Sequence, residues 1–445
     1  MSTRRGTVRF AAAVLVVVSC AATAGCSGTT GSAAASAASS SSAPAPSSSP
    51  SPSPGGAGHT HATSAASTAG AEEGPAAGVR LQALLGQHAV LAADMMRARM
   101  RQDPDFAQAA EAALTRNTQE LSSLLGSLLG ADPAARFAQR WTAHVTDLYA
   151  YAEARRSDDR SALARARRQL GGAEQDLAGF FAEASHGRMS RQTALQGVRM
   201  HVDELLGQAD AYRSRDYATA ATAYRAGYEH AFGLGGALAR ALLPAADATA
   251  LGTPGWQLRS NLTQALGEHV AVVVAAMRAA SGPGAQDFRA LGAELNANTT
   301  ALATAVGTLF GSAAAVRFQS LWADHVDALM DLTAAAAHHD DAGQQDARRR
   351  LSAFEPALAA FLDTATASRV GAEALARAYA DHDGMLVDEV KAYQAQDYTR
   401  AHDLGYRAFS EMADLAGQLS HAIELTLAGR LPRGGSQTGG GGTAP

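Results

Sequence analysis

Residues 81–88 read Leu-Gln-Ala-Leu-Leu-Gly-Gln-His, and residues 262–269 read Leu-Thr-Gln-Ala-Leu-Gly-Glu-His. Each stretch has Leu at its first and fifth positions and His at its eighth, which is the spacing of one face of an α-helix. The second stretch begins 181 residues after the first. The pair predicts a helical unit that occurs twice in the chain.

The same offset of 181 residues relates other rare residue types, so the repeat extends well beyond these two stretches. The matched pairs include Asn117 with Asn298, Trp141 with Trp322, Glu174 with Glu355 and Tyr212 with Tyr393. Chance matches of Asn, Trp and Tyr are improbable in a chain so rich in Ala. We therefore interpret the sequence as a tandem duplication, with the first repeat at 77–250 and the second at 254–432.

The composition favours helices over strands. Aromatic residues make up 6% of the chain and β-branched residues are scarce, while Ala, the best helix former, is abundant. Gly, Pro, Ser and Asp interrupt each repeat at intervals that leave six helical segments. In the first repeat these segments are predicted at 79–100, 104–128, 133–156, 159–184, 190–213 and 217–244. Short connections make consecutive helices antiparallel, so the predicted fold is all-α, with two six-helix up-and-down bundles in tandem.

Charge and motifs argue against several classes of function. The chain carries 37 Lys and Arg residues against 42 Asp and Glu residues, a formal charge of −5, so we expect no basic surface for nucleic acid. The sequence contains no phosphate-binding Gly-Lys-Ser/Thr loop, no Gly-x-Ser-x-Gly elbow and no His-Glu-x-x-His motif. We therefore expect a protein that is not an enzyme.

Residues 1–25 have the order of a bacterial export signal: basic residues, then an apolar run at 10–18, then small residues. The apolar run is too short to span a bilayer. The segment Thr23-Ala24-Gly25-Cys26 resembles the lipobox of bacterial lipoproteins, although Thr23 stands where that motif usually has Leu. The resemblance implies that Cys26 becomes the N-terminus and carries palmitate or another fatty acid. It also implies lipid anchoring at the extracytoplasmic face of the cell membrane.

Two segments have the composition of disordered chain. Residues 26–76 and 433–445 are rich in Ser, Ala, Pro and Gly and lack the apolar residues that build a core. The first of them is predicted to be a tether between the lipid anchor and the repeats. No Cys follows Cys26, which excludes a disulfide or a thiolate metal site beyond that position.

Each repeat carries three His residues at matched positions, on its first, third and fifth predicted helices. These helices run parallel in an up-and-down bundle, and His88, His144 and His201 lie 9 to 11 residues into their helices. At 1.5 Å per residue this is roughly 14–17 Å from the same end, so we expect the three imidazoles in one layer. The matching residues of the second repeat are His269, His325 and His382.

The second, fourth and sixth helices of each repeat contribute further polar residues to that layer. These are Asn117, Glu174 and His230 in the first repeat, and Asn298, Glu355 and Glu411 in the second. We expect them to orient the imidazoles or to serve as occasional ligands.

Three imidazoles in a core layer need a physical reason, because buried polar groups cost free energy unless they are satisfied. One hypothesis is a transition-metal site, since three neutral imidazoles suit Cu, Zn, Ni or Fe ions. The others are a hydrogen-bond network that specifies the core and a site for a small organic ligand. The sequence thus favours a surface-tethered binding module. The alternative is a non-catalytic structural or interaction protein of the envelope, whose protein partner the sequence does not identify.

The repeats resemble those of secreted or lipid-anchored bacterial helical proteins. Units of those proteins open with a Leu-x3-Leu-x2-His pattern and continue with a mid-helix Asn, a Trp-x2-His helix and a later His helix. The opening pattern is present here as Leu81, Leu85 and His88, and again as Leu262, Leu266 and His269. The resemblance covers nearly all of 79–430. It implies a helical-bundle fold and implies no particular activity.

Overall fold

The computed structural model describes residues 74–281 and 285–430. The predicted export signal, Cys26, residues 27–73 of the tether and the C-terminal tail lie outside the described residues, whereas Pro75 and Ala76, which the sequence assigns to the tether, begin the first helix. Within the described ranges every regular element is a helix, which confirms the predicted all-α class.

The first repeat forms the six helices that the sequence predicts, with ends within four residues of the predicted ones. They are α1 (Pro75–Arg101), α2 (Pro104–Leu129), α3 (Ala131–Arg156), α4 (Arg160–Ala184), α5 (Arg191–Arg213) and α6 (Tyr217–Leu242). The connection to the second repeat contains a short helix, α7 (Ala245–Ala250), which the sequence analysis does not predict.

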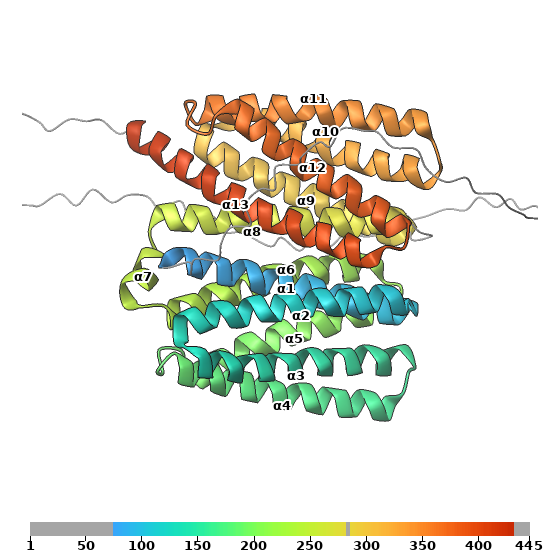
Figure 1. Ribbon diagram of the computed structural model, residues 1–445, viewed down its shortest axis with the longest axis vertical. Helices are drawn as coiled ribbons and strands as arrows, with labels where there is room; N and C mark the ends of the chain where they lie inside the picture. The colour runs from blue at the N-terminus through green and yellow to red at the C-terminus, as the bar shows by residue number, and fades with distance from the viewer. Residues whose placement is uncertain (1–73, 282–284, 431–445) are drawn as a thin grey trace, which may run out of the picture. The chain divides into compact units, whose positions relative to one another are not determined.

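The second repeat follows the same order. Its helices are α8 (Pro254–Ala280), α9 (Ala285–Phe310), α10 (Ser312–Ala337), α11 (Asp341–Ala365), α12 (Ala372–Gln394) and α13 (Tyr398–Arg430). In both repeats each helix packs against the next one in the chain, as expected of an up-and-down bundle (Figure 1).

Matched residues set the helix ends in the two repeats. Asp216 is the N-cap of α6, because its side chain accepts a hydrogen bond from the backbone N–H of Thr219 (3.2 Å). Gly130 precedes α3 with a φ of 94°, a conformation that favours glycine, and Gly311 precedes α10 with the same φ. The turn between the second and third helices is therefore the same in both copies.

The first helix of each repeat is the most enclosed. α1 packs against α2, α3, α5 and α6, and α8 packs in the same way against α9, α10, α12 and α13. Because α1 touches α3 and α5 at once, a residue on α1 can meet residues of both. This arrangement places the histidines of the first, third and fifth helices side by side.

A matched asparagine ties the second helix of each repeat to the first. The Asn117 amide nitrogen donates to the carbonyl oxygen of Leu84 (3.0 Å) and to Gln87 Oε1 (3.1 Å). Asn298 forms the equivalent bonds, to the carbonyl oxygen of Ala265 and to Glu268 Oε1 (both 3.0 Å). These contacts explain why the asparagine stands at the same position in both repeats.

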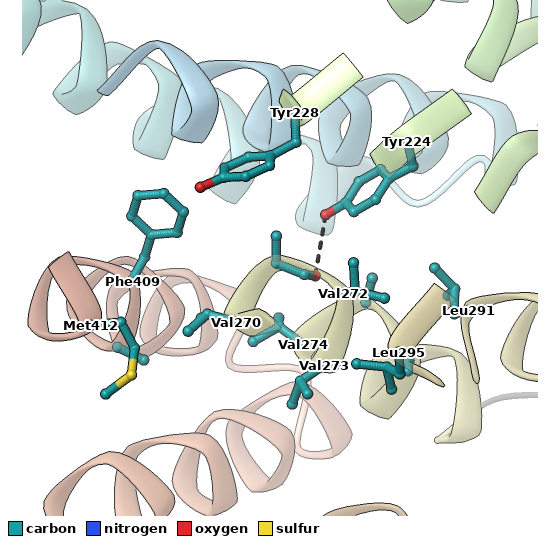
Figure 2. Close-up of a cluster of buried hydrophobic side chains, with 14 of the residues drawn as sticks. Tyr224, Tyr228, Val270, Val272, Val273, Val274, Leu291, Leu295, Phe409 and Met412 are labelled. Carbon is teal, nitrogen blue, oxygen red and sulfur yellow. Dashed lines mark hydrogen bonds between the residues drawn. The ribbon is translucent and has the colours of Figure 1, made fainter. Parts of the chain in front are cut away.

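The two repeats contact each other through matched helices in a reciprocal way. α1 lies against α8, α2 against α13, and α6 against α9, which is the pattern of an isologous, two-fold-like interface. Figure 2 shows part of its apolar core, where Tyr224 and Tyr228 of α6 lie over the valines of α8. The two hydroxyl groups donate to the backbone carbonyls of Ala271 (3.4 Å) and Gln264 (3.0 Å).

A buried ion cluster joins the repeats beside this apolar core. Arg278 of α8, with only 6% of its side chain exposed, donates to Asp94 of α1 (2.6 Å) and to Glu389 of α12 (2.7 Å). The residue of the second repeat that matches Asp94 is Ala275, so this cluster occurs once rather than twice. Each carboxylate depends on the guanidinium to offset its burial.

We predict that Arg278→Ala destabilises the folded chain by about 3–5 kcal/mol, because it leaves two buried carboxylates without a cation. Urea denaturation followed by circular dichroism measures this loss. Arg377→Ala is the control, since Arg377 pairs with Glu373 on the surface and such pairs contribute little. A loss for Arg278→Ala no larger than that of the control would contradict the role assigned to the cluster.

Candidate metal centre

Three buried imidazoles meet at the centre of the first repeat. His88 comes from α1, His144 from α3 and His201 from α5, and their exposed fractions are 0%, 0% and 2%. The ring centroids are 5.6 Å apart for His88 and His144, 5.4 Å for His88 and His201, and 5.5 Å for His144 and His201. The rings form a nearly equilateral triangle, in the single layer that the sequence predicts.

The triangle is close to the size that a metal ion requires. One nitrogen of each ring lies within 4.8 Å of a nitrogen of the other two. Ligand nitrogens on one tetrahedral ion, at bond lengths of about 2.0–2.1 Å, are about 3.4 Å apart. Small rotations of the rings therefore bring all three nitrogens into coordination distance of one ion.

Most nitrogens of these rings have no hydrogen-bond partner among the described residues. Both nitrogens of His144, both of His201 and Nε2 of His88 are buried and unpartnered. A buried polar atom without a partner costs about 1–3 kcal/mol. An ion that accepts a lone pair from His144 and from His201 would relieve one nitrogen of each ring at once.

Of the six nitrogens of the three rings, the remaining one has a hydrogen-bond partner. Nδ1 of His88 accepts a hydrogen bond from the indole Nε1–H of Trp141 (3.3 Å). Because an indole N–H can only donate, this bond places the lone pair of His88 on Nδ1 and its hydrogen on Nε2. Metal coordination by His88 therefore costs the bond to Trp141, whether the ion takes the lone pair on Nδ1 or the ring changes tautomer and binds the ion through Nε2. Either route costs about 1 kcal/mol, against the roughly 10 kcal/mol or more that a structural zinc ion contributes.

Burial keeps these rings uncharged. Desolvation, followed by the neighbouring histidines, holds the pKa of His88 and of His201 well below its usual value. Burial also lowers the pKa of His144 to about 4. At neutral pH each ring thus has the free lone pair that a metal ligand needs.

In the first repeat, the polar residues that the sequence assigns to the same layer form hydrogen bonds with groups other than the three imidazoles. The amide of Asn117 bonds to α1, and Glu174 pairs with Arg199 (3.1 Å). His230 Nε2 donates to the carbonyl oxygen of Gly197 (2.9 Å). Since none of these hydrogen bonds goes to a ring of the triangle, the predicted role in orienting the imidazoles has no contact to support it here.

The matching histidines of the second repeat are more widely spaced. His269, His325 and His382 are buried, but the ring centroids of His269 and His382 are 6.4 Å apart. Among the described residues, the first trio is the group in which three or more ligand atoms of His, Cys, Asp or Glu lie within 4.8 Å of one another, and the second cluster with its nearby carboxylates does not form such a group. Phe354, which replaces Ala173 of the first repeat, stacks on His325 at 4.3 Å. The second cluster therefore has a phenyl ring against His325 where the first repeat has only the methyl group of an alanine.

Sequence reasoning missed a buried carboxylate in the second cluster. Asp383 follows His382 on α12, and its Oδ1 lies 3.5 Å from Nδ1 of His325. Because the matching residue of the first repeat is Val202, a search for features common to both repeats passes over it. A comparison of the two repeats for differences would have found it, because Asp383 is a charged residue at a position that is apolar in the first repeat.

No family model, curated protein or solved structure matches the chain. None of the helices in the described ranges combines the length and the apolar character that crossing a membrane requires.

We predict that acid destabilises the folded chain between about pH 6.5 and pH 4. The unfolded chain protonates its histidines near pH 6.5, whereas burial keeps the histidines with lowered pKa neutral in the folded chain below that pH, His144 and His382 down to about pH 4. The residues concerned include His88, His144, His201, His269 and His382. Since the unfolded state binds more protons, the free energy of unfolding decreases as the pH is lowered. The decrease is up to about 1.4 kcal/mol per pH unit for each histidine.

Urea titrations at pH 7, 6 and 5 in the presence of a chelator test this prediction. His144→Gln should flatten the pH dependence, and His186→Gln, at an exposed position, should leave it unchanged. A free energy of unfolding that is constant between pH 7 and pH 5 would show that the rings are not held neutral by burial.

Proposed function

We propose that the chain is a metal-binding protein that holds one transition-metal ion between His88, His144 and His201. The observation that carries the proposal is the set of five buried, unpartnered nitrogens on three converging rings. Three neutral nitrogen donors suit copper, zinc, nickel or iron.

Burial favours binding over catalysis. The three rings are at most 2% exposed, so an ion between them would have no surface on which a substrate could approach it. Storage, delivery and sensing of a metal need no such approach. We therefore propose a binding role for this site and no reaction.

The place of action that we propose is the outer face of the cell membrane. Its support is the leader at 1–25 and the lipobox-like segment that ends at Cys26. In this proposal the lipid on Cys26 anchors the chain, and residues 26–76 hold the helical repeats away from the membrane.

One contact favours a second candidate function, a structural protein of the envelope. The bond between Trp141 and His88 is what a core hydrogen-bond network would contain. That network would have to leave five ring nitrogens without partners, which is why we favour the metal.

We predict that the full chain, exported by its host and purified without chelator, contains a transition metal that His88→Ala/His144→Ala/His201→Ala loses. Elemental mass spectrometry measures the metal per chain, and circular dichroism verifies that the variant stays helical. The control is His186→Ala, which changes a histidine in an exposed turn. A wild-type chain that contains no metal and binds no added copper, zinc, nickel or iron would contradict the proposal.

We also predict that Trp141→Phe tightens metal binding by roughly fivefold. It removes the donor that competes for Nδ1 of His88, and a hydrogen bond of about 1 kcal/mol corresponds to that factor. Competition against a chelator of known affinity measures the change. Phe137→Leu, which alters the apolar packing beside Trp141, is the control for packing effects. Weaker binding in Trp141→Phe than in this control would count against the proposed competition.

A further inference from the structure

A partly enclosed cavity lies where the two repeats meet. It has a volume of about 460 Å³, and its walls come from α1, α5 and α6 of the first repeat and from α8, α9 and α12 of the second. Tyr212 and Tyr393, which are matched residues of the two repeats, both line it. Cavities that bind small molecules have volumes of about 300–1,000 Å³ and often lie at such contacts. The charges that line this cavity indicate which class of molecule it suits.

Half of the charged side chains that line the cavity are already engaged. Arg278 pairs with the two carboxylates of the buried ion cluster, and Arg213 pairs with Asp158 (3.0 Å). The carboxylate of Asp103 caps α2, because it accepts a hydrogen bond from the backbone N–H of Phe106 (3.1 Å). The charged residues that remain for a ligand are Arg101, Arg215 and Asp287.

Asp287 of α9 is buried with an unpartnered carboxylate oxygen. The residue lines the cavity and is 6% exposed, and its Oδ1 accepts no hydrogen bond from the described residues. Burial raises the pKa of Asp287 in spite of the opposing charges of Arg97 and Arg101. A buried carboxylate oxygen in this state costs free energy, which a hydrogen-bond donor on a bound molecule recovers. Asp287 therefore favours a ligand with a cationic donor group.

The buried position of Asp287 distinguishes the second repeat from the first. Asp105 precedes Phe106 in the first turn of α2, as Asp287 precedes Phe288 in the first turn of α9. Asp105 is exposed to solvent. A carboxylate in the first turn stabilises its helix at either position. Helix stabilisation thus explains why both residues are acidic, but it does not explain why Asp287 is buried beside a cavity.

Two exposed guanidinium groups at the cavity have no carboxylate partner. Arg101 and Arg215 both line it, and neither forms an ion pair within the described part of the chain. Gln396 is the counterpart of Arg215 and has the same left-handed backbone conformation, with a φ of 60° against 63°. The turn therefore does not require an arginine at this position. The two guanidinium groups favour a ligand with a carboxylate.

We infer that the cavity binds a small zwitterion, a free amino acid or a molecule like it that carries both an ammonium group and a carboxylate. The ammonium group donates to Asp287 Oδ1 and lies among the tyrosine rings, whose faces attract a cation. The carboxylate pairs with Arg101 and Arg215. A simple anion would leave Asp287 unpartnered, and a simple cation would leave both guanidinium groups unpaired. This site shares no residue with the histidine triangle and does not depend on the proposed metal.

Calorimetric titration of the full chain with free amino acids tests the inference. Each standard L-amino acid is titrated, and the one that binds most tightly is compared with its amide, which lacks the carboxylate, and with its N-acetyl form, which lacks the ammonium group. We expect each blocked form to bind at least about tenfold more weakly, because each leaves part of the charge in the cavity unpaired. Equal binding of either blocked form, or a chain that binds no amino acid, would overturn the inference.

Two variants assign the two ends of the ligand. Asp287→Asn should bind the free amino acid at least about tenfold more weakly and lose the preference for it over the N-acetyl form. Arg215→Gln, which introduces the residue of the matched turn, should weaken the free amino acid by about threefold or more and leave the affinity for the amide unchanged.

Asp105→Asn is the matched control, because it changes the exposed counterpart of Asp287, and it should bind the amino acid as the wild type does. Circular dichroism verifies that the three variants stay helical. Unchanged affinity for the free amino acid in Asp287→Asn and Arg215→Gln would show that the amino acid binds elsewhere and would overturn the assignment to this cavity.

Discussion

The structure depends on the burial of imidazole rings at the centre of each bundle. His88 lies on the most enclosed helix of its repeat, and His144 and His201 reach it because α3 and α5 both pack on α1. Burial keeps the rings uncharged and separates their nitrogens from water. The described side chains offer the first trio one partner, the indole of Trp141. That shortage of partners is the reason to propose a metal, since an ion can accept several lone pairs at one point.

Duplication supplies the same helical frame twice, and the two copies differ most in their buried polar groups. At the contact between the repeats, Asp94 stands where the second copy has Ala, and Arg278 offsets its charge. At the second histidine cluster, Asp383 stands where the first copy has Val, and its Oδ1 lies 3.5 Å from Nδ1 of His325.

Much of the fold could be predicted from the sequence, because helix periodicity and capping are local properties. The six helices of each repeat and the common layer of His88, His144 and His201 follow from spacing. What the sequence could not supply depends on contacts between distant segments. The acceptor of each buried amide, the bond between Trp141 and His88 and the ion cluster of Arg278 are examples. The wider spacing of His269 and His382 and the stacking of Phe354 on His325 likewise depend on packing between distant segments.

We propose that three histidines of the first repeat share one ion. X-ray absorption at the edge of the metal that the purified chain contains is the most direct test. We expect three imidazole nitrogens at about 2.0–2.1 Å from the metal. A metal surrounded by water oxygens, or one whose imidazole signal survives in His88→Ala/His144→Ala/His201→Ala, would contradict it.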